Sequence, residues 1–135
     1  MPRPKKLDGD AFQFYLDERA FYYLKLKEGE EFSTDHLKEI VDFVQGEHES
    51  QKLPFLIELG FGATVSEGVQ EHLANGKERY SIADAILIST FAHRLITKFY
   101  KRHFKPTRPT KVFQDVFEAL DWIAHQNRDL ALSKG

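Results

Sequence analysis

The sequence lacks cysteine altogether, and its 135 residues include one methionine and one tryptophan. The absence of cysteine excludes disulfides, thiolate zinc sites and cysteine nucleophiles, and it permits a reducing compartment without requiring one. No apolar run approaches the roughly 20 residues of a membrane-spanning helix, and no apolar segment follows the basic start of the chain as it would in a signal peptide. We therefore expect a cytoplasmic protein without a transmembrane segment.

Acidic residues are missing from one segment and concentrated in another. Residues 85–114 carry seven bases and no Asp or Glu, whereas residues 28–49 carry eight acids and the single base Lys38. The net charge of −2 hides this separation. Such asymmetry can steer an anionic partner or support head-to-tail contacts between copies, and it is equally compatible with ordinary solvated surface.

The chain shows neither an internal repeat nor a linker, so we expect one domain at residues 11–126 with tails at residues 1–10 and 127–135. A chain of this length can bury about two thirds of its unfolded surface in a single core. Alternating apolar residues predict a hairpin of two half-buried strands at residues 12–16 and 22–26.

Strands and helices are expected to alternate after this hairpin. Helical spacing or capping patterns predict helices that begin near Ser33 or Thr34, Thr64, Phe91 and Asp115, with capping boxes at residues 64–67 and 115–118. Apolar runs predict strands at residues 53–59, 82–88 and 110–113, and the continuous run at 82–88 is typical of burial on both faces. Trp122 is expected in the core. The order ββαβαβαβα implies an α/β fold with a mixed, mostly parallel sheet.

With this order, the chain resembles the STAS/SEC14-like (SpoIIAA-like) superfamily of bacterial domains, and more closely a set of small uncharacterised bacterial proteins. The resemblance is carried by three features: the strand Pro109-Thr110-Lys111-x-Phe113, the helix Glu118-Ala119-x-x-Trp122, and the strand and helix of residues 85–100. It extends over residues 12–123 and implies the fold far more than an activity.

In the anti-sigma factor antagonists of this superfamily, a phosphorylatable serine at the start of a helix acts as the switch. The resemblance places the matching turn at residues 60–68, with these candidate residues: Gly60, Gly62, Thr64, Ser66, Glu67 and Gly68. With Gly68 aligned to the motif glycine, the acceptor position holds Glu67 and the motif aspartate is missing. Ser66 and Thr64 remain hydroxyls at a helix N-terminus, where a phosphate would be favoured. The alternative is that Thr64 is simply an N-cap with Glu67 as its capping-box partner.

A second candidate site lies on the helix after residue 90, where basic residues recur at helical spacing opposite the apolar stripe Phe91, Leu95, Ile96 and Phe99. This basic ridge consists of Arg94, Lys98, Lys101, Arg102 and Lys105. A positive ridge suits a nucleic acid backbone, an anionic membrane surface or other anionic ligand, or an acidic protein face such as residues 28–49 of another copy. We favour an unknown protein partner, keep self-association open, and rank nucleic acid last. An exposed helix face kept soluble by its bases explains the pattern equally well.

Other constellations give weaker signals. The Gly60-Phe61-Gly62 turn lacks the third glycine of a dinucleotide fingerprint, and six scattered histidines form no paired ligand motif on a helix. Glu58 in an apolar strand is either a tuned acid or a side chain that points to solvent.

We expect no cofactor, no metal and no enzymatic activity, and interpret the chain as a non-enzymatic regulatory or protein-interaction module of the STAS type. The alternative is a carrier for a small apolar or lipid-like ligand, which would require an apolar cavity of several hundred cubic ångströms.

Overall fold

A six-stranded sheet forms the centre of the molecule in the computed structural model, which describes residues 6–47, 52–75 and 81–134. The sheet has the order β1-β2-β3-β5-β7-β8. Its strands are β1 (Lys6–Asp8), β2 (Phe12–Asp17), β3 (Phe21–Leu26), β5 (Leu53–Leu59), β7 (Ser81–Leu87) and β8 (Thr110–Phe113). The first three strands pair antiparallel, and β3, β5, β7 and β8 pair parallel. The predicted mixed, mostly parallel sheet is confirmed.

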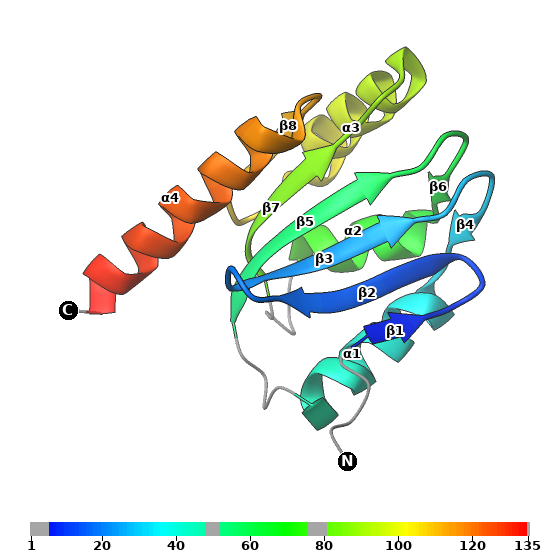
Figure 1. Ribbon diagram of the computed structural model, residues 1–135. Helices are drawn as coiled ribbons and strands as arrows, with labels where there is room; N and C mark the ends of the chain where they lie inside the picture. Colours follow the sequence, from blue (N-terminus) through cyan, green and yellow to red (C-terminus); the bar gives the residue numbers. More distant parts are fainter. Residues whose placement is uncertain (1–5, 48–51, 76–80, 135) are drawn as a thin grey trace.

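The helices cover both faces of this sheet (Figure 1). They are α1 (Thr34–Glu47), α2 (Glu67–Asn75), α3 (Phe91–Phe104) and α4 (Val116–Lys134). On one face, Ile40 and Val44 of α1 and Val69 of α2 join a large aromatic core. On the other face, α4 buries Ala119 and Ile123 against the sheet. α3 lies beside α2 and reaches the edge strand β8.

Alternation in the sequence explains why the hairpin faces the core as it does. Phe12 and Phe14 are fully buried, whereas Gln13 between them and Tyr15 after them are half-buried, as a period of two requires. The strand predicted at residues 82–88 is buried on both faces, because α2 and α3 cover one side of β7 and α4 the other.

The structure differs from the sequence analysis at both ends of the chain. Lys6–Asp8, expected in a tail, forms β1 and pairs with residues 13–15 of β2. Residues 127–134, also expected in a tail, continue α4. Trp122 is half-buried and packs on Phe113, with 5.7 Å between the ring centroids.

The predicted capping box at Thr64 is wrong. Thr64 and Val65 form the short strand β6 (Thr64–Val65), which pairs with β4 (Glu31–Phe32) in a separate two-stranded sheet. This pairing holds the backbone extended, so α2 begins later, at Glu67. Ser66 is the N-cap instead, and its Oγ accepts a hydrogen bond from the Val69 N–H at 3.4 Å. At the start of α4, Asp115 caps as predicted, because its Oδ1 accepts from the Phe117 N–H at 2.7 Å.

Candidate functional site

Helix α3 carries the basic ridge, and local interactions define where it begins and ends. Thr90 is its N-cap and accepts a hydrogen bond from the His93 N–H at 3.1 Å. Lys105 ends the helix in the left-handed conformation with φ of 49°. The last turn carries three bases and the first turn no acid. Positive charge near the C-terminus is favourable to the helix dipole.

The buried side of α3 is polar. His93, Thr97 and Tyr100 are the residues that it buries. The Thr97 hydroxyl donates to the His93 carbonyl oxygen at 2.9 Å, and the His93 Nε2 donates to the Ala63 carbonyl oxygen at 3.0 Å. These contacts satisfy the Thr97 hydroxyl and the His93 Nε2, whereas the His93 Nδ1 and the Tyr100 hydroxyl have no hydrogen-bond partner among the described residues. They also fix α3 against the turn that follows β5.

The apolar stripe of α3 is exposed, contrary to its expected place on the side away from solvent. Phe91 is 73% exposed, Leu95 53% and Phe99 56%, and Ile96 is 39% exposed. The helix is rotated so that Tyr100 and Thr97, together with the edge of Ile96, meet the sheet and α2. The basic ridge is therefore not opposite the stripe. Both lie on the solvent side of one helix.

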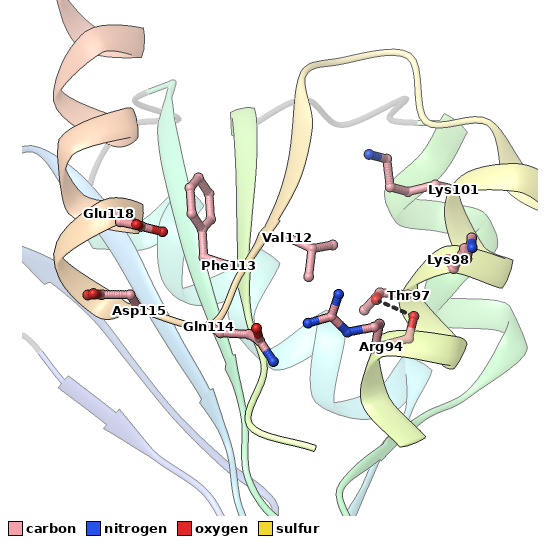
Figure 2. A pocket seen from close by; sticks show the side chains of 9 residues that line it. All are labelled: Arg94, Thr97, Lys98, Lys101, Val112, Phe113, Gln114, Asp115 and Glu118. Carbon is pink, nitrogen blue, oxygen red and sulfur yellow. Dashed lines mark hydrogen bonds between the residues drawn. The ribbon is translucent and has the colours of Figure 1, made fainter. Parts of the chain in front are cut away.

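The structure divides the basic ridge into two parts. Three of its members line an open groove between α3 and the edge of the sheet: Arg94, Lys98 and Lys101. Figure 2 shows Arg94 and Lys101 reaching from α3 toward β8. Arg102 lies one helical turn after Phe99 and Lys98, on the outer side, and Lys105 is the residue that ends the helix.

The switch-turn candidates do not form a cluster of functional side chains. The Cα of Gly60 lies close to the backbone of β3, and an added Cβ would be 2.5 Å from the Leu26 carbonyl oxygen. Gly62 has a φ of +73°, a conformation that favours glycine. An added Cβ on Gly68 would meet Thr34 at 2.9 Å. Thr64 is in β6, Ser66 caps α2 and Glu67 is exposed. All of these residues except the exposed Glu67 thus have a place in the framework, and their role as a switch turn stays a prediction.

A small apolar cavity lies between α2, α3 and the strands β5 and β7. Its volume is about 60 Å³, and Ile57, Ile86 and Leu73 contribute to its lining. Gln70 and Tyr100 also line it. The Gln70 Oε1 and the Tyr100 hydroxyl are buried and have no hydrogen-bond partner among the described residues. Burial raises the pKa of Tyr100 to about 12. The surface of this space is apolar, and at this volume it is too small for a lipid chain.

A buried ion pair escaped the sequence analysis. Asp84, 2% exposed in the middle of β7, accepts a hydrogen bond from the Arg108 Nε at 2.9 Å and one from the Ser81 hydroxyl at 2.6 Å. The charged Asp84 in an otherwise apolar strand was the only available signal. Glu58 is half-buried and accepts a hydrogen bond from the Tyr23 hydroxyl; burial, with this bond, raises the pKa of Tyr23.

Two further observations limit the kinds of site present in the described ranges. No group of three or more histidine or acidic side chains there could hold a metal ion. Every helix within those ranges is too short or too polar to cross a bilayer.

Comparisons with known proteins agree with this fold. A family model described as "Domain of unknown function (DUF7793)" matches residues 14–127. Among solved structures, the chain is similar to an uncharacterised protein of the DUF3478 family from Shewanella loihica PV-4, which has a SpoIIAA-like fold. The TM-score is 0.51 at 19% identity, and the match covers 87% of this chain and 98% of that chain. No curated protein matches the chain. The fold is therefore SpoIIAA-like, as the resemblance in the sequence implied.

Proposed function

Because the chain belongs to the DUF7793 family, whose function is unknown, and has a SpoIIAA-like fold, we propose from its geometry that it is a non-enzymatic interaction module. Its docking surface is the outer face of α3, which consists of Phe91, Leu95, Phe99 and Arg102. The partner is a protein segment that is both apolar and acidic.

One observation carries this proposal: large apolar side chains remain exposed at successive turns of one helix. Phe91, Leu95 and Phe99 are spaced by four residues, and each is more than half exposed. Residues at this spacing share a face, and amphipathic partners use such anchors when they dock. Contiguous exposed apolar surface on a folded domain marks an interaction site more often than scattered residues do.

The charge around the outer face indicates the chemistry of the partner. Lys98 and Arg102 follow Leu95 and Phe99 by three residues, so they border the apolar side chains on the helix surface. Residues 85–114 contain no acid to neutralise them. Acidic groups beside an apolar core would complement this face and would accelerate encounter at low salt.

A second copy of the chain fits the face less well. A symmetric contact between two α3 helices would bring Lys98 and Arg102 against the same bases of the other copy. An asymmetric contact with the acidic α1 of another copy would leave one α3 and one α1 unused in a dimer, so association would continue into a ring or an open chain. A different protein avoids both problems.

The carrier alternative has less support. The cavity between α2 and α3 holds about 60 Å³, whereas ligand pockets usually have about 300–1,000 Å³.

The proposal is tested by capture from the native cell extract, followed by titration with a synthetic peptide that spans the acidic segment of the captured protein. The variant Leu95→Ser/Phe99→Ser should bind this peptide at least tenfold more weakly, because each lost apolar contact is worth about 1.5–3 kcal/mol when fully buried. Arg102→Glu should also weaken binding, most strongly at low salt.

Two matched variants serve as controls. Phe117→Ser removes an aromatic ring that is 77% exposed on α4, and Lys52→Glu reverses an exposed charge outside α3. Both should bind like the wild type. The proposal fails if no captured protein distinguishes the α3 variant from Phe117→Ser. It also fails if the outer face is needed instead for sedimentation with anionic vesicles or for self-association.

A further inference from the structure

The open groove beside α3 is distinct from the outer face. Its volume is about 580 Å³, and none of Phe91, Leu95 and Phe99 lines it. One wall is formed by α3, the floor by Val112 and Phe113 of β8, and the opposite wall by the start of α4. This volume lies within the range of roughly 300–1,000 Å³ that is usual for small-molecule sites.

The two walls carry opposite charges that do not neutralise each other. Arg94, Lys98 and Lys101 stand on α3, and none of them has an ion-pair partner among the described residues. Asp115 and Glu118 stand on the opposite wall, and neither approaches these bases within ion-pair distance. Asp115 also uses one carboxylate oxygen to cap α4. Figure 2 shows Asp115 and Glu118 on one side and the bases on the other.

The groove lies where open α/β sheets commonly bind ligands. α3 follows the carboxyl end of β7 and packs on one face of the sheet, whereas α4 follows the carboxyl end of β8 and packs on the other (Figure 1). The chain therefore diverges to opposite faces beside the carboxyl ends of two neighbouring parallel strands. A crevice at such a place is the usual binding position in this class of sheet.

We propose that this groove binds a small organic anion. Its phosphate or carboxylate group is held by Arg94, Lys98 and Lys101, and hydroxyl or amino groups at its other end donate to Asp115 and Glu118. The guanidinium group of Arg94 can donate two parallel hydrogen bonds to a phosphate or to a carboxylate, and the two lysines add positive charge beside it. A ligand with an acidic end and a hydrogen-bond-donating end complements both walls. This site goes beyond the interaction function proposed above.

Three probes with nearly the same carbon skeleton test the proposal by NMR titration of the full chain. Glucose 6-phosphate carries a phosphate, gluconate carries a carboxylate, and glucose is the neutral control. We expect saturable shifts at the amides of residues 94–101 and 112–118 with at least one anion and none with glucose. The two anions show which acidic group the site takes.

Two double variants with the same loss of charge decide whether the groove is responsible. Arg94→Gln/Lys101→Gln should weaken binding at least tenfold, whereas Arg102→Gln/Lys105→Gln, on the same helix but outside the groove, should leave it unchanged. Equal weakening by both pairs would mean unspecific attraction to a basic helix and would overturn the proposal. So would the absence of any saturable shift. Neither result would affect docking at the outer face, which is tested by Leu95→Ser/Phe99→Ser.

Discussion

At the scale of single residues, Asp84 is the most consequential feature of the core. Its carboxylate is buried in β7 and is held by Arg108, whose side chain is only 11% exposed. A buried charge is tolerated when it is paired and hydrogen-bonded, and it becomes costly when its partner is removed. The pair also connects β7 to the loop before β8, and so helps to position the edge strand that forms the floor of the groove.

We predict that Arg108→Met lowers the free energy of unfolding by about 3–5 kcal/mol, because it leaves the Asp84 carboxylate buried without its cation. Urea denaturation measures the loss. Asp84→Asn/Arg108→Met should recover much of it, since no buried charge remains.

The exposed pair between Lys27 and Asp8, at 3.0 Å, provides the control for this prediction. Lys27→Met should cost at most about 1 kcal/mol, because solvent screens an exposed ion pair. An equal loss of unfolding free energy in Arg108→Met and Lys27→Met would show that leaving the Asp84 carboxylate buried without its cation carries no additional cost.

At the scale of elements, α3 shows that apolar character alone does not determine which side of a helix is buried. Thr97 is buried at low cost because its hydroxyl bonds to carbonyl groups of its own helix. Tyr100 presents a large ring to the cavity formed with α2 and β5. The apolar side chains Phe91, Leu95 and Phe99 are thereby left outside.

We predict that two neighbouring aromatic residues of α3 contribute very differently to the free energy of unfolding. Tyr100→Ala should destabilise the fold by about 3–5 kcal/mol, as large-to-small core changes do. Phe99→Ala should change stability by no more than about 0.5 kcal/mol, as is usual on the surface. Thermal and urea unfolding of both variants measures the difference. Similar losses at the two positions would mean that α3 packs through its apolar stripe, as the sequence analysis expected.

At the scale of the whole molecule, buried tyrosines make the stability of the fold depend on pH in the alkaline range. Burial raises the pKa of both Tyr22 and Tyr100 from 10.0 to about 12. Below pH 10 both the folded and the unfolded chain keep these protons. Between about pH 10 and 12 the unfolded chain has lost protons that the folded chain retains, so unfolding becomes more favourable as the pH rises.

We therefore predict that the urea midpoint falls between about pH 10 and 12. The midpoint of Tyr100→Phe should fall less steeply than that of the wild type, because the variant lacks one of the tyrosines whose pKa folding raises. Parallel curves for the two proteins would contradict the raised pKa of Tyr100. Absorbance of tyrosinate follows the ionisation directly.

Charge is also distributed on the molecular scale. The acidic α1 lies toward one end of the sheet and the basic α3 toward the other, so the separation seen along the chain persists in space (Figure 1). This arrangement can orient an approaching partner before contact.

The sequence by itself determined the order of the main elements and the mostly parallel sheet. These follow from local information: the period of two at Phe12 and Phe14, the continuous apolar run of β7, and the need for helical crossovers between parallel strands. The SpoIIAA-like fold was implied by the resemblance that residues 85–123 carry. It also identified α3 as a basic helix and Asp115 as a cap.

Only the tertiary structure decided how these elements face one another. The pairing of Thr64 with Glu31 moved the start of α2 to Glu67, because a strand contact distant in sequence outweighed a local capping pattern. In the same way, contacts with α2 and Ala63 selected the polar side of α3 for burial. Rotation of a helix about its axis depends on the neighbours that cover it, and those neighbours are brought together only by the fold. The outer face and the groove both result from that rotation.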